Sequence, residues 1–435
     1  MIRLLTLLAL LAASPVRAAV DIQEVTSPGG ITAWLVEEHS IPFTAIEIRF
    51  KGGASLEEPG KRGAINLMTG LIEEGAGDMD AQAFAVAQEA LAARFGFDVY
   101  DDSLSISARF LSENRAESVA LLKAALTRPR FDQDAVDRVR DQVLSSLRSN
   151  ATDPDEIAAK AFDEMVYGDH PYGSNLQGTL ETVSALTRDD VVAAHRNVLT
   201  RDHVYVGAVG DITAEELGLL LDELLGDLPA AGAPEPGMAT PEFTGGITVI
   251  PFDTPQSVAV FGHQGIRRDD PDFFAAFVLN QILGGGDRAS RLMEEVREKR
   301  GLTYGIYTWL VDADYADLLM GQVKSANNRI AEAIEVIRFE WARIAAEGVT
   351  AEELEDAQTY LTGAYPLRFD GNARIAGILV GMQMTGLPID YPATRNDKIN
   401  AVTLEDIKRV AARLIRPENL HFVVVGQPEG LETTN

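Results

Sequence analysis

Arg297 and Tyr304 lie seven residues apart in the run REKRGLTYG and are suited to stabilising a developing negative charge. A planar guanidinium and a phenol both donate strong hydrogen bonds to a carbonyl oxygen that gains charge. Leu292 and Val296 give this segment an apolar helical face, and Gly301 suits a helix C-cap. We therefore expect Arg297 on the last helical turn and Tyr304 on the following strand. The alternative is a solvated arginine and a half-buried tyrosine without a function.

Other residues that could carry catalysis or bind a metal lack the required spacing. The chain has no cysteine, which excludes thiolate ligands and disulfides. Gly284–Gly286 lacks the Gly-Lys-Ser/Thr of a phosphate loop, and Ser290 lacks the context of a nucleophile elbow. Acidic pairs such as Glu57 and Glu58 fit solvated turns better than a glycosidase dyad. None of the six histidines pairs at helical spacing: His39, His170, His195, His203, His263 and His421.

Length and charge limit the class of protein. The 435 residues are 46% hydrophobic, enough for two or more domains with their own cores. With 38 basic and 66 acidic side chains, the formal charge of −28 argues against binding to nucleic acid or to anionic membrane surfaces.

Residues 1–18 have the pattern of a secretory signal peptide. Arg3 precedes an apolar run from Leu4 to Ala13, and small residues flank a cleavage position at Ala18. The run is too short for an ordinary membrane span, although an uncleaved anchor is the alternative. We expect a mature protein in the periplasm, or otherwise exported, that does not contact a membrane.

An internal repeat predicts two homologous halves. Residues Thr187–Gly210 align without a gap on residues Thr403–Gly426, 216 positions later, as a capped helix followed by a strand ending in glycine. A weaker echo relates Ala64–Gly75 to Ala275–Gly286. The segment 229–240, rich in proline, glycine and alanine, has the composition of a linker between domains 19–228 and 241–435. The mixed pattern of strands and helices indicates an α+β fold in which each half has a largely antiparallel sheet with helices on one face.

The segment 282–308, ILGGGDRASRLMEEVREKRGLTYGIYT, resembles the C-terminal half of the M16 family, which includes insulinase, pitrilysin and mitochondrial processing peptidase. Ser290, Arg291 and Leu292 match the family's Ser-Arg-Leu, followed by Arg297 and Tyr304. The resemblance implies two halves of the M16/LuxS-like metallohydrolase fold facing each other. It also implies that Arg297 and Tyr304 bind the substrate peptide near zinc, with the tyrosine stabilising the oxyanion.

The zinc motif of this family is degenerate in the first half. After the segment EEPGKRGA, which resembles the family's approach to His-x-x-Glu-His, Asn66 and Gly70 stand at the histidine positions and Thr69 at the general base. Ser146 stands at the position of the third ligand, a glutamate. Asparagine and serine are poor zinc ligands, glycine has no side chain, and threonine is no base near neutral pH. We therefore expect no zinc site in this chain.

The resemblance implies a non-catalytic subunit of a heterodimeric zinc peptidase. A homologous partner would hold the zinc, and this chain would close the chamber and bind peptide substrates. Phe95, Gly96 and Phe97 resemble the part of the family that captures substrate by strand addition. Two alternatives stay open. One is a non-enzymatic assembly or scaffold protein of the same descent, and the other, a self-sufficient peptidase, would need a zinc site that the sequence does not provide.

Overall fold

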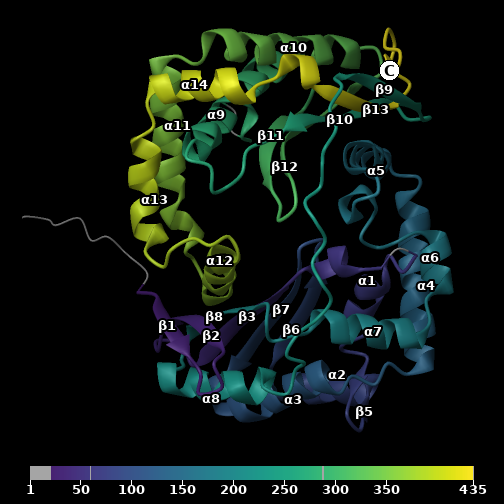
Figure 1. The fold of residues 1–435 in the computed structure, drawn as a ribbon, viewed down its shortest axis with the longest axis vertical. Helices are drawn as coiled ribbons and strands as arrows, with labels where there is room; N and C mark the ends of the chain where they lie inside the picture. Colours follow the sequence, from purple (N-terminus) through teal and green to yellow (C-terminus); the bar gives the residue numbers. More distant parts are fainter. Residues whose placement is uncertain (1–20, 59, 287–288, 435) are drawn as a thin grey trace, which may run out of the picture.

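The strands of the chain form two main sheets, one in each half (Figure 1). The computed structural model describes residues 21–58, 60–286 and 289–434, so the predicted signal peptide at 1–18 lies outside the described residues. In order across the first sheet, the strands are β1 (Gln23–Thr26), β2 (Thr32–Glu37), β8 (Val204–Gly210), β3 (Phe43–Lys51), β7 (Ser103–Leu111) and β6 (Arg94–Val99).

The second sheet repeats the order of the first. Its strands are β11 (Ile306–Asp312), β12 (Asp317–Ala326), β10 (Gln256–Gln264), β13 (His421–Gly426) and β9 (Gly246–Pro251). Read in the opposite direction, this order is β9-β13-β10-β12-β11, and it corresponds strand by strand to β2-β8-β3-β7-β6 of the first sheet. In each sheet one pair is parallel, β2 with β8 and β9 with β13, while the other pairs are antiparallel. The predicted α+β fold with two homologous halves is confirmed.

The clearest match between the halves is the predicted repeat itself. α7 (Arg188–Val198) and α14 (Leu404–Leu414) both begin with a capping box, made by Thr187 with Asp190 and by Thr403 with Asp406. Each helix leads into the strand that the sequence pattern predicted, β8 or β13. Thr and Asp three residues apart fix the same helix start in both halves.

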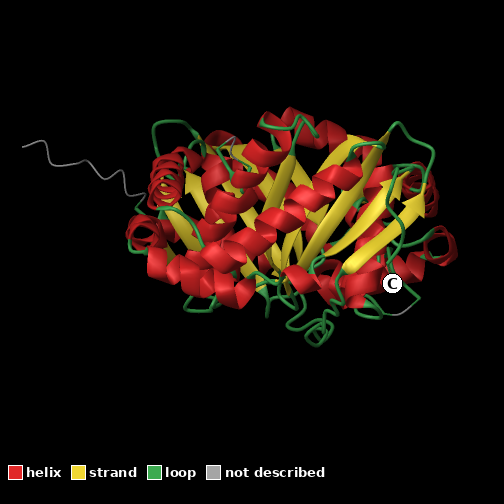
Figure 2. Cartoon of the chain, turned by 90° about the horizontal axis from the view of Figure 1, so that it is seen from above, coloured by secondary structure: helices red, strands yellow, loops and turns green. Residues whose placement is uncertain are grey.

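The other helices cover the sheets, and long helices lie across the strands when the molecule is seen from above (Figure 2). In the first half they are α1 (Ala64–Thr69), α2 (Ala81–Ala90), α3 (Arg115–Thr127), α4 (Gln133–Asn150), α5 (Pro154–Tyr167), α6 (Leu180–Ala185) and α8 (Ala214–Leu225). In the second half they are α9 (Phe273–Gly284), α10 (Ile330–Glu347), α11 (Ala351–Ala364), α12 (Asn372–Met384) and α13 (Tyr391–Asn400). A short hairpin of β4 (Gly75–Ala76) and β5 (Met79–Asp80) precedes α2.

The two halves exchange a helix, which the sequence pattern did not predict. α5 of the first half packs on β10 and β13 of the second sheet, and α12 of the second half packs on β8 and β3 of the first (Figure 1). Gly207 in β8 lets α12 approach, because a Cβ there would lie 2.5 Å from the carbonyl oxygen of Ala376. At Gly262 in β10, a Cβ would lie 2.8 Å from the carbonyl oxygen of Leu319 on the neighbouring strand and 3.2 Å from the Phe162 ring of α5. Each sheet thus has a helix from the other half against it.

The chain passes between the halves through a segment without helix or strand. It runs from the end of α8 to the start of β9 and includes the predicted linker at 229–240. Among the described residues, no helix combines the length and the apolar character needed to cross a bilayer.

The exchange predicts that one buried side chain of α5 stabilises both halves. Phe162 is fully buried in an apolar cluster with residues of the second sheet, including Val260 and Val423. We expect Phe162→Ala to lower the free energy of unfolding by about 3–5 kcal/mol, because it removes an aromatic ring and leaves a cavity. Phe339→Ala on α10, where the ring is 62% exposed, is the matched control and should change it by less than about 0.5 kcal/mol. Urea unfolding measures both, and equal effects would contradict the assigned role of α5.

The polar face of α5 predicts a pH effect. Burial, reinforced by the negative charges of Asp101 and Glu164, raises the pKa of the half-buried Asp163 to about 7. The folded protein therefore keeps a proton that the unfolded chain releases near pH 4, so this group's contribution to stability is lost as the pH rises through about 7. Asp163→Asn should raise the melting temperature by roughly 1–3 °C at pH 8 and by less at pH 5.

The control for this titration is Asp169→Asn, which removes an exposed carboxylate just beyond the same helix. It should shift the melting temperature equally at pH 5 and pH 8. Melting curves at both values test the assignment, and an Asp163→Asn effect that does not grow with pH would contradict it.

Candidate functional site

The four positions expected to have lost zinc ligands line one cavity in the first half. Asn66 and Thr69 lie on α1, Gly70 directly follows it, and Ser146 lies on the facing α4. Phe97 of β6 closes another side of this space, which has a volume of about 440 Å³ and is called the α1 cavity below. The fold thus places these four positions together although 76 residues separate Gly70 from Ser146.

The side chains in the α1 cavity do not suit a metal ion. The buried Thr69 uses its hydroxyl to donate to the carbonyl oxygen of Ile65 at 2.8 Å. Gly70 offers no side chain, and a Cβ there would lie 3.1 Å from Cγ1 of Val139. No group of three or more histidine, aspartate or glutamate side chains with metal-binding geometry occurs among residues 21–58, 60–286 and 289–434. The residues present do not fit zinc.

None of the six histidines, all of which are described, lines the α1 cavity. The most deeply buried, His263, accepts a hydrogen bond from the indole of Trp341 at 2.9 Å. Burial lowers its pKa to about 4, so the ring is neutral near neutral pH. His195 faces the carbonyl oxygen of Leu126 at 2.8 Å, a contact that suits a histidine with a structural role.

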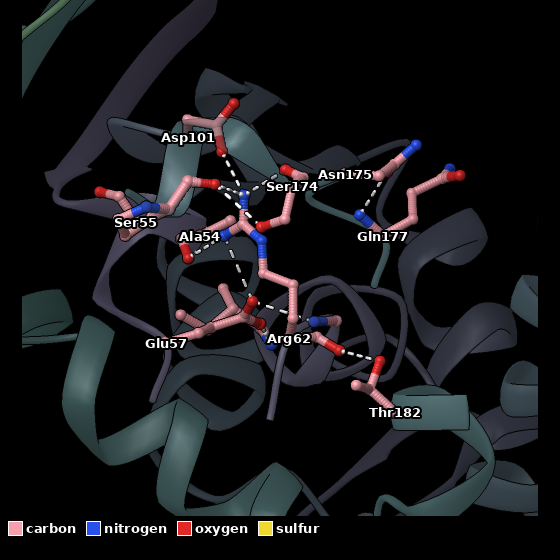
Figure 3. Close-up of polar contacts among 12 residues, drawn as sticks. Ala54, Ser55, Glu57, Arg62, Asp101, Ser174, Asn175, Gln177 and Thr182 are labelled. Carbon is pink, nitrogen blue, oxygen red and sulfur yellow. Dashed lines mark hydrogen bonds and ion pairs between the residues drawn. The ribbon is translucent and has the colours of Figure 1, made fainter. Parts of the chain in front are cut away.

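A buried arginine holds the approach to α1 in place (Figure 3). The Arg62 guanidinium, 8% exposed as a residue, lies 2.7 Å from the carboxylate of Asp101 and 3.4 Å from that of Glu57. It also donates to three carbonyl oxygens, those of Ala54, Pro171 and Ser174. One cation therefore joins the turn before α1, the β6–β7 connection and the loop after α5. No local sequence pattern marks Arg62, because its partners lie up to 112 residues away.

Glu57 fixes the start of α1 by accepting from helix amides. Its carboxylate accepts from the amide of Ile65 at 2.5 Å and from that of Gly63 at 2.9 Å. A carboxylate at this end of a helix satisfies amides that lack a partner within it. Burial raises the pKa of Glu57 to about 7, although these amides and Arg62 favour the charged form. The start of α1, which carries the degenerate zinc positions, is therefore held in place by side-chain contacts.

The predicted substrate segment, Phe95 to Phe97, lies on β6 at the edge of its sheet. β6 pairs only with β7 among the described strands, so its other edge faces no strand of the sheet. An unpaired edge can accept an extended peptide as an added strand. Phe97 also lines the α1 cavity, which places this edge beside the degenerate site.

Arg297 lies on a helical turn before Gly301, but the turn is wider than expected. Residues Met293–Glu298 form a π-helix, in which the amide of Lys299 donates to the carbonyl oxygen of Glu294. Such turns occur often at functional sites. Gly301 ends the turn with a left-handed φ of 59°, as predicted. The guanidinium of Arg297 lies 3.4 Å from the exposed carboxylate of Glu298, so it can exchange this partner for a ligand.

Tyr304 does not lie on a strand, and that prediction was wrong. β11 begins at Ile306, because the hydroxyl of Thr303 donates to the carbonyl oxygen of Lys324 and accepts from the amide of Gly305. These side-chain bonds replace the first rung of the β ladder and leave Tyr304 in a bend. Its side chain is 88% exposed.

The structure does not bring Arg297 and Tyr304 into one cavity. Tyr304 lines a shallow hollow of about 260 Å³ whose lining does not include Arg297 or any residue of the α1 cavity. Behind this hollow, Asp155 of the exchanged helix α5 pairs with Lys324 at 2.7 Å and accepts from Gln322 at 2.7 Å. No local sequence pattern predicts this contact between the halves.

Family models match both halves of the chain. Residues 33–180 match the model described as Insulinase (Peptidase family M16), and residues 185–361 match the model described as Peptidase M16 inactive domain. The two segments meet near α6, inside the first half.

Relatives and solved structures match nearly the whole chain. A protein named Non-peptidase homolog YmxG from Helicobacter pylori is 26% identical over 89% of this chain and 90% of its own length. A protein named an uncharacterized zinc protease from Streptomyces coelicolor is also 26% identical, over 90% of this chain and 86% of its own. The crystal structure of a peptidase M16 inactive domain from Pseudomonas fluorescens superposes with a TM-score of 0.87 at 27% identity, over 95% of this chain and 100% of that one.

The fold, the α1 cavity and these comparisons agree. Two halves repeat one topology, the α1 cavity lacks metal-binding side chains, and one relative is named a non-peptidase homolog. The chain belongs to the M16 peptidase family.

Proposed function

We propose that this protein is the non-catalytic subunit of a heterodimeric M16-type zinc peptidase, acting after export to the periplasm or a similar compartment. One observation carries the proposal. The α1 cavity has no metal-binding set of side chains in its lining, whereas Tyr304 of the second half is 88% exposed with its phenol in reach of another molecule. A phenol exposed on a structured bend can donate to a group on another molecule, and tyrosine is enriched at interfaces for this reason.

In this proposal a homologous partner supplies the zinc, and this chain supplies donors from the second half. The Tyr304 phenol would donate to the oxygen of a peptide carbonyl as it gains charge in the partner's site. Arg297, which among the described residues forms an ion pair only with the exposed Glu298, would release that carboxylate and grip the peptide backbone. The free edge of β6 would extend the substrate surface by strand addition.

The name of the Helicobacter pylori relative, a non-peptidase homolog, also supports a second candidate. A scaffold protein of M16 descent would use the same two-half fold for assembly and would need neither Arg297 nor Tyr304. The two candidates differ in one outcome, namely whether a partner's peptidase activity depends on this chain.

The geometry of the α1 cavity predicts the zinc content of the purified protein. The isolated mature chain should hold far less than one zinc per molecule and cleave no unfolded peptide, because Thr69 and Gly70 supply no ligand or base. Metal analysis after mild purification measures this. One tightly held zinc per wild-type chain would contradict the proposal.

A gain-of-function variant tests whether the α1 cavity fails to bind zinc only because it lacks ligand side chains. The variant carries the ligand substitutions Asn66→His, Gly70→His and Ser146→Glu and the base substitution Thr69→Glu, which together should create a zinc site. It also carries Val139→Ala, because a Cβ at residue 70 would otherwise lie 3.1 Å from Val139. We expect about one zinc per chain. The same variant with Gly70 left unchanged lacks one ligand and is the matched control, which should bind zinc more weakly.

The role of the second half is tested by mixing with the zinc-bearing homologue. Peptidase activity should appear on mixing, and Tyr304→Phe should lower turnover about a hundredfold, as expected for the loss of a donor worth about 3 kcal/mol. Arg297→Ala should mainly raise the apparent Michaelis constant, because it also removes ground-state binding. Tyr360→Phe on α11, a phenol with 48% exposure, is the control and should change neither.

Two results would contradict this role. A partner equally active without this chain would favour the scaffold candidate. A Tyr304→Phe protein with a lower melting temperature but normal turnover would mean that Tyr304 is structural.

A further inference from the structure

A second cavity lies in the second half, away from the α1 cavity and the Tyr304 hollow. It has a volume of about 570 Å³ and lies between α9, α12, α13 and the short turn Pro366–Arg368. We call it the arginine pocket. It shares no lining residue with the α1 cavity or the Tyr304 hollow. Its volume is typical of sites for small organic ligands.

One part of the arginine pocket is apolar. Phe273 and Phe277 of α9 stack with ring centroids 6.2 Å apart and an angle of 18° between their planes. Ile378 and Met382 of α12 and Leu387 complete this wall. Such a surface favours an aliphatic chain or an aromatic ring.

The other part of the arginine pocket is cationic. Four arginines line it: Arg268, Arg368, Arg374 and Arg395. Within residues 21–58, 60–286 and 289–434, none of the four lies within 4.0 Å of a carboxylate oxygen, the limit for an ion pair. The carboxylate of Asp312 interacts with the charge of Arg268 without forming an ion pair. Arg368 and Arg374 are exposed, so the missing ion pair that needs an explanation is that of the buried Arg395.

Aromatic rings hold two of these arginines at the pocket. The Arg268 guanidinium lies 4.4 Å from the centroid of Phe273 and donates to the Tyr391 hydroxyl at 3.0 Å. The Arg395 guanidinium lies 4.3 Å from the centroid of Tyr365. These cation–π contacts fix the orientation of the guanidinium groups and compensate only part of their lost hydration.

Arg395 is the buried member of the set, with 5% exposure. It donates to the carbonyl oxygen of Leu361 and to the side-chain oxygen of Asn396, each at 3.1 Å. Burial lowers its pKa, and the positive charge of Arg368 lowers it further. A buried cation next to a second cation is normally paired with an anion.

These features match a ligand with one anionic group and an apolar body. Guanidinium groups bind carboxylates through two parallel hydrogen bonds, and the anion would relieve the repulsion among the arginines. The neighbouring aromatic and aliphatic wall would cover the remainder of the ligand. We propose that the arginine pocket binds a carboxylate attached to an apolar chain or ring, with the carboxylate at Arg368, Arg374 and Arg395.

Two sources present this chemistry: a free aliphatic carboxylate and the C-terminal residue of a peptide that ends in an apolar side chain. Octanoate probes the first source, and acetyl-Ala-Ala-Phe with a free carboxylate probes the second. Octan-1-ol and the amide of the same peptide are the matched probes without charge. Tight binding of one acid and not the other supports the proposal and identifies the source.

Isothermal titration of the whole mature chain tests the proposal. At least one acid should bind at least tenfold more tightly than its uncharged counterpart, and added salt should weaken its binding. The double variant Arg368→Gln/Arg374→Gln removes two exposed arginines and should weaken binding at least tenfold without affecting the fold. Arg196→Gln/Arg201→Gln, two exposed arginines outside the pocket, is the control and should bind like the wild type.

Three results would overturn the proposal. The first is that each acid binds the protein no more tightly than its uncharged counterpart. The second is that the Arg368→Gln/Arg374→Gln variant binds the acid as tightly as the wild type does. The third is that neither acid binds at millimolar concentration. The test is independent of the peptidase partner, since the proposal does not rest on the function of Arg297 and Tyr304.

Discussion

The exchange of α5 and α12 between the halves is the contact on which the rest of the structure depends. Each helix buries its apolar face against the sheet of the other half, and glycines in β8 and β10 allow the close approach. Neither sheet is fully covered by helices of its own half, so separating the halves would expose two apolar surfaces. Asp155 at the start of α5 also reaches Lys324, behind the hollow at Tyr304. The exchange therefore fixes where the second half presents Tyr304 relative to the first half.

The first half keeps the form of a metal site while its chemistry is lost. Arg62 and Glu57 hold the start of α1 through hydrogen bonds to three segments of chain, so no metal is required to position this helix. The α1 cavity stays open between α1, α4 and β6. Val139 occupies part of the space that a side chain at position 70 would need. A cavity stabilised in this way can be retained for the shape of the fold, and the free edge of β6 beside it remains accessible to an extended peptide.

Local sequence patterns predicted those features of the fold that depend on residues close together in the chain. Two helix starts could be predicted because each depends on a threonine and an aspartate three positions apart, Thr187 with Asp190 and Thr403 with Asp406. The positions of Asn66 and Ser146 in the first half could be predicted from the spacing of the family's zinc motif. Contacts between distant segments could not be predicted in this way. The partners of Arg62 are spread over the chain, α5 has no pattern that marks it for the other sheet, and the bend at Tyr304 depends on a bond from Thr303 to Lys324. The arginine pocket likewise forms only when α9, α12 and α13 come together.

The central claim is that Tyr304 faces the partner's metal site when the two chains pair. Site-specific photo-crosslinking tests it most directly, with a benzophenone amino acid placed at position 304 and, as control, at the exposed position 339 on α10. We expect position 304 to crosslink to the partner next to its His-x-x-Glu-His helix, or to a peptide bound there, and position 339 to crosslink to neither. A stable complex in which position 304 crosslinks to neither would contradict the account.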